Sequence, residues 1–213
     1  MISFILTVLN RPDMLTHFFQ KLPFQSGEYE FVLVDNASDA PTKQVEFWLQ
    51  NTFKNVLLVE NSRNEGFGPG NNTGAEIANG DILVFTQPDV EFHGDVTKMV
   101  SEVVDGILYG HQLLDYDTGW NRFGNIIVPY LTGYFLACTK HTWKVLGGFD
   151  PRYYPADFED VDLSFTAIHN GLGLKEIDVP VTHDHFGSTW AQFSNREETT
   201  KRNRGLFAQK WGL

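Results

Sequence analysis

The chain has 213 residues, of which 42% are hydrophobic and 20% are charged, so it is long enough for one globular domain with a sizeable core. Its formal net charge of -11 at pH 7 excludes a general cationic surface, and we therefore expect neither nucleic acid nor an anionic membrane as a partner. Cys138 is the single cysteine, which excludes an intrachain disulfide and favours a reducing, cytoplasmic location.

Two apolar stretches are too short to cross a bilayer. Residues 1–9 have no basic leader and run into Asn10-Arg11-Pro12, which predicts a first strand and not a signal peptide. Residues 126–138 are interrupted by Pro129 and Gly133 and fall short of the roughly 20 residues that a membrane-spanning helix needs. We therefore expect no stable membrane insertion.

Strand and helix patterns alternate through the first 92 residues. Apolar runs predict strands at 3–9, 30–34, 55–60 and 82–86. A helix beginning at Pro12 and a second one around Val45 to Leu49 fall between the first three strands. This order predicts an α/β fold with a mostly parallel, doubly wound sheet and right-handed crossovers.

Acidic and amide side chains follow two of these strands. Asp35 and Asn36 come directly after the second strand, and Gln87-Pro88-Asp89 ends the fourth. Ligands of open α/β sheets bind in the crevice beyond the carboxyl ends of the strands, where a carboxylate can hold a divalent cation against phosphate. Asp89 is a candidate for that role, and a turn residue that caps the next element is the alternative.

The region 61–75 is rich in glycine and asparagine. Gly66, Gly68 and Gly70, together with Pro69, predict a sharp loop whose backbone approaches a phosphate or a sugar, with a short helix starting at Asn71. The region does not match GxGxxG after the first strand, and the chain has no GxxxxGK[ST]. A flexible surface loop is the alternative.

The second half is less regular. Its patterns predict helices at 93–104, 140–146 and 196–211, and strands at 107–116, 130–139 and 174–179. The turn-rich stretch 117–125 carries Trp120 and suggests a substrate-side loop. The last helix is basic and is either a docked closing helix or a positive cover over a diphosphate.

Two further clusters can carry chemistry. Asp157, Glu159, Asp160 and Asp162 place four acids in six residues at the start of a helix, which either cap that helix or accept a proton from a substrate hydroxyl. His183 and His185 share one face of an extended segment, where they are either metal ligands or structural.

Taken together, these motifs resemble those of the GT-A glycosyltransferases of the large inverting family 2, especially its rhamnosyltransferase-like branch. The blocks that carry the resemblance, in the order and spacing of that family, are 34–39, 64–68, 71–74, 87–90, 147–150, 158–163, and His183 with 187–188. The resemblance implies one GT-A domain over 1–213, with a nucleotide-sugar-binding half (1–92) and an acceptor and catalytic half (93–213).

The resemblance also implies roles for single residues. Asp160 would be the general base, with Glu159 orienting it, and Asp89 with His183 or His185 would hold Mn²⁺ or Mg²⁺. The donor, a UDP- or dTDP-linked sugar, would contact Thr7, Leu9, Asn10, Arg11, Asp35, Asn36, Asn64, Gly66, Phe67, Asn71, Gln87 and Pro88. The acceptor, a glycan or another hydroxyl compound, would contact Trp120, Gly133, Tyr134 and Asp157. Polysaccharide biosynthesis is the expected setting.

Two departures from the family pattern stand out. Gln87 replaces the first acid of the DxD motif, and Thr166 stands where relatives often carry Arg. The rival functions are a nucleotidyltransferase of sugar metabolism and a catalytically silent glycan- or nucleotide-binding module. The first would need a glycine-rich signature with Arg and Lys directly after the first strand, and the presence of both Asp89 and Asp160 argues against the second.

Overall fold

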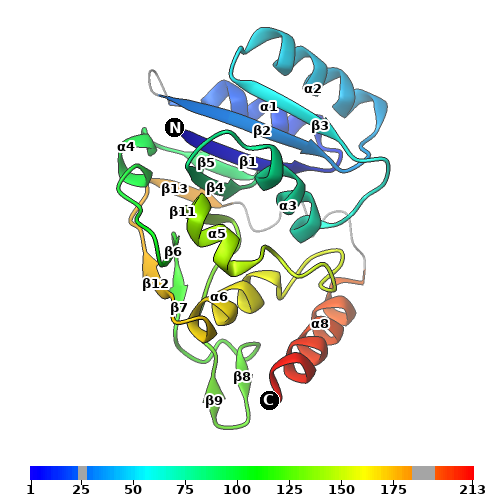
Figure 1. The fold of residues 1–213 in the computed structure, drawn as a ribbon. Coiled ribbons are helices and arrows are strands. Elements are labelled where there is room, and N and C mark those ends of the chain that lie inside the picture. The colour runs from blue at the N-terminus through cyan, green and yellow to red at the C-terminus, as the bar shows by residue number, and fades with distance from the viewer. Residues whose placement is uncertain (24–27, 184–194) are drawn as a thin grey trace.

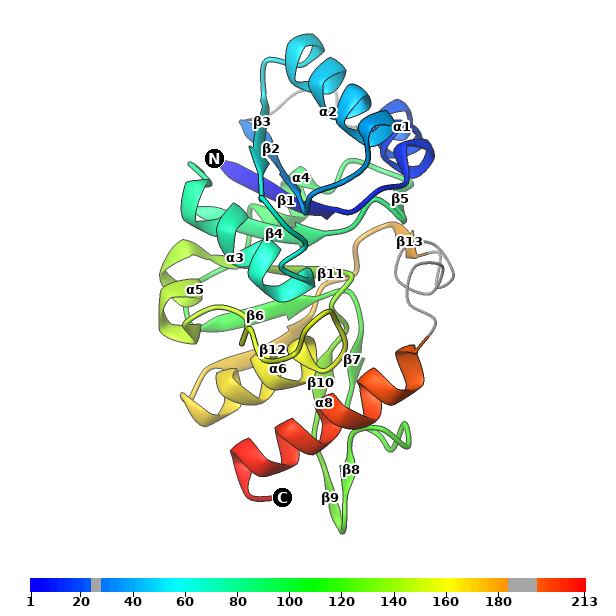
Figure 2. The same ribbon diagram turned by 90° about the vertical axis from the view of Figure 1, so that its right-hand side faces the viewer.

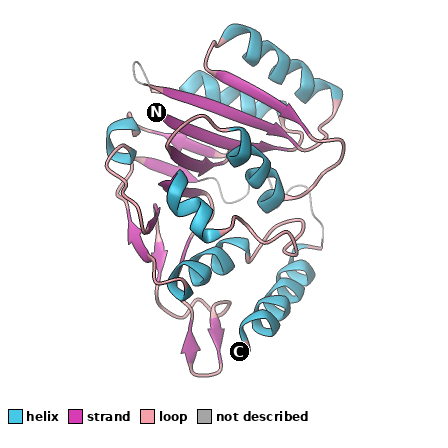
Figure 3. Cartoon of the chain, in the orientation of Figure 1, coloured by secondary structure: helices cyan, strands magenta, loops and turns pink. Residues whose placement is uncertain are grey.

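The computed structural model describes residues 1–23, 28–183 and 195–213 (Figure 1). Its centre is a seven-stranded sheet in the order β12-β6-β11-β4-β1-β2-β3. The bounds of these strands are β1 (Ile2–Val8), β2 (Tyr29–Asp35), β3 (Val56–Glu60), β4 (Ile82–Thr86), β6 (Ile107–Gly110), β11 (Phe135–Thr139) and β12 (Gly173–Glu176). Figure 3 shows this sheet among its helices. The α/β class and the alternating first half are as predicted.

The sheet is mostly parallel. β1 pairs in parallel with β2 and β4, β2 with β3, and β6 with β12. β11 is the exception, because it runs antiparallel to both β4 and β6. The second half of the chain therefore enters the same sheet as the first half.

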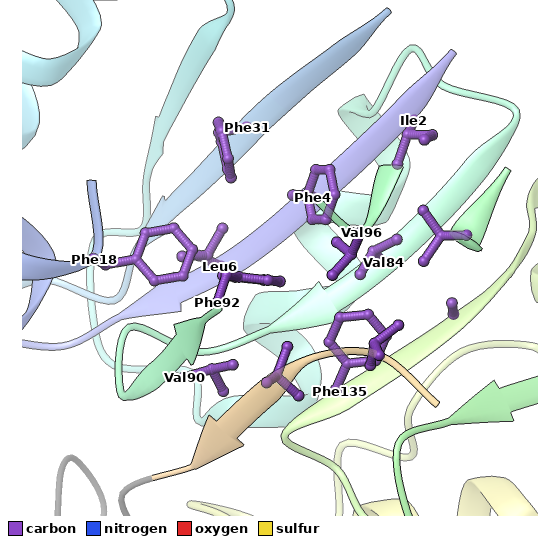
Figure 4. Close-up of a cluster of buried hydrophobic side chains, with 14 of the residues drawn as sticks. Ile2, Phe4, Leu6, Phe18, Phe31, Val84, Val90, Phe92, Val96 and Phe135 are labelled. Carbon is purple, nitrogen blue, oxygen red and sulfur yellow. The ribbon is translucent and has the colours of Figure 1, made fainter. Parts of the chain in front are cut away.

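Helices cover both faces of the sheet. One apolar cluster packs α1 (Pro12–Lys21), α2 (Ala40–Thr52) and α4 (Thr97–Val100) against the sheet, and another packs α3 (Phe67–Ile77), α5 (Lys140–Leu146) and α6 (Glu159–His169). These two groups of helices lie on opposite sides of the sheet in Figure 2. Along β1, Phe4 and Leu6 belong to the first cluster (Figure 4). Ile5 belongs to the second, which explains why the strand is apolar at successive positions.

The glycine-rich region is helical from Phe67 onward, earlier than the expected start at Asn71. Gly66 precedes the helix with φ 90°, a left-handed value that favours glycine. A Cβ on Gly70 would lie 2.6 Å from Thr7 Cγ2, and one on Gly74 would lie 2.4 Å from Ile5 Cγ2. The glycines of α3 thus let the helix approach the central strand, a packing role that the expectation of a ligand-facing loop did not include.

The second half departs from the predicted elements. The helix expected at 93–104 is limited to α4, because residues 93–96 and 101–104 on either side of it form bends, turns and irregular segments that directly follow β5 (Val90–Phe92). The strand expected at 107–116 is divided into β6 and β7 (Leu113–Leu114), and that expected at 130–139 into β10 (Tyr130–Leu131) and β11. Gly133 lies in the break of the second one. The strand expected at 174–179 ends at Glu176, before β13 (Val181–His183).

Two peripheral elements complete the fold. A small hairpin is formed by β8 (Arg122–Phe123), within the predicted turn-rich stretch 117–125, and β9 (Ile126–Ile127), directly after it. The predicted last helix is α8 (Arg196–Trp211), drawn in red at the C-terminus in Figure 1. Its Phe207 and Trp211 pack against Phe165 of α6. None of the helices described here is long and apolar enough to cross a membrane.

Candidate active site

One cavity of about 640 Å³ opens beyond the carboxyl end of β4. It is lined by residues from both halves of the chain, so the shared sheet brings the two predicted acidic sites to one place. The predicted residues on its walls are Phe67, Gln87, Asp89, Trp120, Gly133, Tyr134, Asp157, Glu159, Asp160 and His183.

The first acidic site is built by short strands. β4 ends at Thr86, and the turn that follows delivers Asp89 directly before β5. β5 pairs with β13 in a register that sets His183 opposite Val90, the neighbour of Asp89. The distance between Asp89 Oδ1 and His183 Nε2 is 3.6 Å. The rings of His183 and Tyr134 are stacked with centroids 4.5 Å apart, which fixes the imidazole plane. His185 lies outside the described residues.

Asp89 and His183 suit a divalent cation. The side chain of Asp89 is 3% exposed and that of His183 is 17% exposed, so both are largely shielded from bulk water. No group of three or more His, Cys, Asp or Glu that could hold a metal was found among the described residues. A hard cation that binds nucleotides commonly takes one or two protein ligands and completes its shell with phosphate oxygens and water. The pair therefore fits a cation that arrives with a diphosphate.

The second acidic site lies at the first turn of α6. Asp160 Oδ2 accepts a hydrogen bond of 3.0 Å from the Gly133 amide, and its Oδ1 accepts one of 2.8 Å from the Val161 amide. A Cβ on Gly133 would lie 3.2 Å from Asp160 Cβ, so a glycine here allows the carboxyl to approach the backbone. These contacts fix the carboxyl where the break between β10 and β11 meets α6.

Burial changes the acidity of both carboxyls. It raises the pKa of Asp160 above its ordinary value, although the hydrogen bonds from Val161 and Gly133 oppose the change. It raises the pKa of Glu159 well above the ordinary value, and the negative charges of Asp160 and Asp157 add to the effect. Glu159 Oε2 is buried and has no hydrogen-bond partner among the described residues. A carboxyl with a raised pKa is a stronger base once it is ionised.

The loop before Glu159 is held by α8, a contact that the sequence analysis did not predict. Asp157 and Phe158 have left-handed φ values of 77° and 76°. Arg196 Nη2 lies 2.6 Å from Asp157 Oδ1, and Thr200 Oγ1 donates to Asp157 Oδ2 at 2.7 Å. Asn203 Nδ2 donates to the carbonyls of Ala156 and Asp157 at 2.9 and 2.8 Å. The spacing 196, 200, 203 places all three on one helical face, which is the signal that the sequence offered.

Asp162, the last acid of the cluster, has a structural role. It accepts hydrogen bonds from the Tyr153 hydroxyl at 3.0 Å, from Trp211 Nε1 at 2.8 Å and from Lys210 Nζ at 2.7 Å. Its side chain is 3% exposed, so the three donors satisfy a buried carboxylate. Two of them belong to α8, which ties the end of that helix to α6.

The other predicted donor residues do not line the cavity, and several of them make polar contacts with one another and with nearby backbone. Asp35 is fully buried, its Oδ1 accepts from the Ser38 amide at 2.7 Å, and Lys43 Nζ lies 3.4 Å from its Oδ2. Asn36 Nδ2 donates to the Gly66 carbonyl at 2.9 Å, and Asn64 Oδ1 accepts from the Gly66 amide at 2.9 Å.

The predicted donor residues that follow β1, Asn10 and Arg11, also do not line the cavity. Arg11 pairs with Asp13 at 2.9 Å, and the Asn10 amide donates to Ser38 Oγ at 2.8 Å. The remaining donor residues that do not line the cavity are Thr7, Leu9, Asn71 and Pro88. Lining residues that the sequence analysis missed are Gln112, Leu114, Tyr130, Thr132, Ala156, Phe158, Val161, Arg196, Glu197 and Thr200.

The sequence matches the family model described as glycosyl transferase family 2 over residues 3–144. Comparison with curated proteins gives no match. The fold is similar to those of many solved chains, of which three illustrate the range. The mannosyltransferase PcManGT from Pyrobaculum calidifontis, in complex with GDP-Man and Mn²⁺, has 18% identity and a TM-score of 0.64, over 82% of this chain and 54% of that one.

GalNAc-T7 with UDP, GalNAc and Mn²⁺ has 14% identity and a TM-score of 0.69, over 85% of this chain and 42% of that one. S. aureus TarS 1-349 in complex with UDP-GlcNAc has 15% identity and a TM-score of 0.66, over 97% of this chain and 66% of that one. The present chain thus spans 42–66% of the length of these three solved chains. At these identities the likeness establishes the fold, which is the GT-A glycosyltransferase fold.

Proposed function

This chain belongs to glycosyl transferase family 2, and from that premise we propose that it transfers a sugar, with inversion, from a nucleoside diphosphate sugar to an acceptor hydroxyl. The observation that carries the proposal is the single cavity that Asp89 and Asp160 share, although they come from different halves of the chain. Inversion needs a leaving-group site and a proton acceptor on opposite sides of one sugar carbon. The cavity offers one acidic site for each.

The leaving-group side is assigned to Asp89 and His183. A bound Mn²⁺ or Mg²⁺ would neutralise the charge that develops on the departing diphosphate. Asp89 and His183 would be its protein ligands. Gln87 replaces the first acid of the motif, so its side-chain amide can donate a hydrogen bond to a phosphate oxygen but adds no charge.

The acceptor side is assigned to Asp160. Its carboxylate would remove the proton from the acceptor hydroxyl as that oxygen attacks the anomeric carbon. The amides of Gly133 and Val161 hold the carboxylate in place, so it need not reorganise during the reaction. Burial raises the pKa of Glu159 well above the ordinary value, which favours its protonated form, and a protonated carboxyl can donate a hydrogen bond that orients the base or the acceptor.

The finer assignments rest on resemblance. A hexosyl donor linked to UDP or dTDP, the rhamnosyltransferase-like branch, cytoplasmic polysaccharide biosynthesis and the donor contacts at Asp35 and Asn64 all belong to the proposal. The structural neighbours bind GDP-Man in one case and UDP-GlcNAc in another, so similar folds accept different donors.

The test measures donor-dependent release of nucleoside diphosphate, with and without Mn²⁺. Asp160→Asn should retain donor binding in a thermal-shift assay and lose transfer by about 10²–10⁴-fold. Asp89→Asn should weaken the donor binding that depends on metal. Asp178→Asn, an exposed acid that does not line the cavity, is the matched control and should behave as the parent. Transfer by Asp160→Asn at the parent rate would refute the base assignment.

A further inference from the structure

The cavity walls carry an uneven balance of charge. Among the described residues that line the cavity, the acidic ones are Asp89, Asp157, Glu159, Asp160 and Glu197. Arg196 is the one lysine or arginine in the same described set. Burial raises the pKa of Glu159, which favours its neutral form, but Asp160 must be ionised to act as the base. Asp157 is paired with Arg196 and Glu197 with Lys201, so the carboxylate of Asp160 is the negative charge that an acceptor meets when the enzyme is competent.

Arg196 does not offset this charge for an incoming ligand. Its guanidinium is bound to the Asp157 carboxylate, with Nη2 at 2.6 Å and Nε at 3.1 Å from that group's oxygens. Such a bidentate pair is a strong, geometrically specific interaction, and breaking it would leave the partly buried Asp157 unpaired. Arg196 thus stabilises the loop before Glu159 by binding Asp157.

Three other basic side chains also interact with groups of the protein itself. Arg122 lies 2.8 Å from Asp117, and Lys201 lies 2.6 Å from Glu197. Arg204 stacks over the Phe123 ring at 4.3 Å and donates to the Trp120 carbonyl at 3.0 Å.

We propose that the acceptor is an uncharged carbohydrate hydroxyl, and that acceptors carrying phosphate, sulfate or carboxylate near the reacting hydroxyl are rejected. This inference rests on the proposed function. The donor diphosphate is also anionic, but a cation held by Asp89 and His183 would offset its charge. A second anion beside Asp160 would meet like charge in a partly dry cavity, where Coulomb repulsion is poorly screened.

The other lining residues suit a neutral sugar ring. Trp120 lines the cavity with 42% of its surface exposed, and Tyr130 also lines it. Aromatic rings pack against the apolar C–H face of a sugar, while side chains such as that of Gln112 can hydrogen-bond its hydroxyls without adding charge. Apolar surface and neutral polar groups are thus both available for an acceptor.

The experiment compares matched acceptor pairs in the presence of donor and Mn²⁺. The neutral members are methyl glucoside, methyl galactoside and methyl mannoside, and the anionic members are their 6-phosphates and 6-carboxylates. The measured quantity is the acceptor-dependent increase in nucleoside diphosphate release above donor hydrolysis. We expect kcat/KM to be about tenfold or more higher for the neutral member of a pair.

A charge variant sharpens the comparison. Gln112→Arg adds a cation to the cavity wall and should lower the neutral-to-anionic ratio by about tenfold. Gln44→Arg makes the same substitution at an exposed position of α2 that does not line the cavity, and should leave the ratio unchanged.

Two outcomes overturn different claims. A ratio at or below one in the parent protein would refute the inference while the transferase function stands. Absence of nucleoside diphosphate release and of donor-induced thermal shift with UDP-, dTDP- and GDP-linked sugars would refute the proposed function itself, and the acceptor inference with it.

Discussion

The two acidic sites of the cavity are held in different ways. Asp89 directly precedes β5 and His183 ends β13, and these two strands are joined by backbone hydrogen bonds. Glu159 and Asp160 follow two residues with left-handed φ, and side chains of α8 hold that loop from about 40 residues further along the chain. The first site therefore depends on the sheet, and the second depends on a small number of polar side chains. We expect the second to be the more sensitive to substitution.

The largest effect that separates the two sites should come from Arg196→Met. Loss of the guanidinium leaves Asp157 without its bidentate partner and frees the loop that positions Asp160. Misplacement of a catalytic group by about 1 Å can cost on the order of 10²-fold in rate, so we expect kcat to fall about 100-fold. Metal-dependent donor binding should stay near the parent value, because Asp89 and His183 are held by the sheet.

Lys201→Met is the matched control for that variant, since it removes a cation from an exposed position of the same helix. It should leave kcat within a factor of two of the parent. Equal losses of donor affinity and kcat in Arg196→Met would show that the two sites are not separately supported.

Gly74→Ala tests how closely α3 packs on the central sheet. The new Cβ would lie 2.4 Å from Ile5 Cγ2 in the central strand, so α3 or β1 must shift. Overpacking of this kind costs about 1–3 kcal/mol, which a urea or thermal unfolding curve would detect. Gly205→Ala in α8 has no atom within 4 Å of the new Cβ and should instead stabilise by up to about 1 kcal/mol. A destabilising Gly205→Ala would contradict this reading of α8.

The smallest of these effects is a displacement of the acid limb in the pH profile of kcat. Burial raises the pKa of Asp160, and the base must be ionised, so activity should be lost as pH falls through a value above the ordinary range for aspartate. Folding stability has the opposite dependence: a carboxyl whose pKa is raised in the folded state stabilises the fold at low pH, and this contribution is lost as pH rises.

Glu159→Gln identifies the group responsible for the limb. If Asp160 is the base, the limb persists in this variant, and kcat measured between pH 4 and 8 still falls towards acid. Disappearance of the limb would assign it to Glu159. The same variant should flatten the dependence of unfolding free energy on pH, since the pKa of Glu159 is also raised.

Local patterns were sufficient to predict the first half of the fold. Strands and helices there alternate with clear periods, and Asp89 follows its strand directly, so its place at the sheet edge could be read from the chain. The glycine-rich region shows the limit of local reasoning. Its glycines were expected to face a ligand, but the nearest atoms to Gly70 and Gly74 belong to β1, a contact that no local pattern contains.

The second half was predicted less well for a related reason. The breaks at 111–112 and 132–134 are set by pairing with other strands and by the contact between Gly133 and Asp160. The support of Asp157 by Arg196, Thr200 and Asn203 joins residues some 40 positions apart. The sequence showed that the acids and the basic helix exist, but their pairing is a property of the folded chain.

The antiparallel strand β11 has a consequence for any attempt to divide the molecule. It lies between β4, from the first half, and β6, so residues 1–92 end with one side of β4 unpaired when they are expressed alone. Phe85 would also lose Trp143 and Phe149, whose rings lie 4.4 and 5.6 Å away. A fragment with such a bare strand edge is prone to aggregate, whereas the two fragments produced together should associate through β11 and restore one sheet. Fragment complementation, and not domain dissection, is therefore the suitable way to study the halves separately.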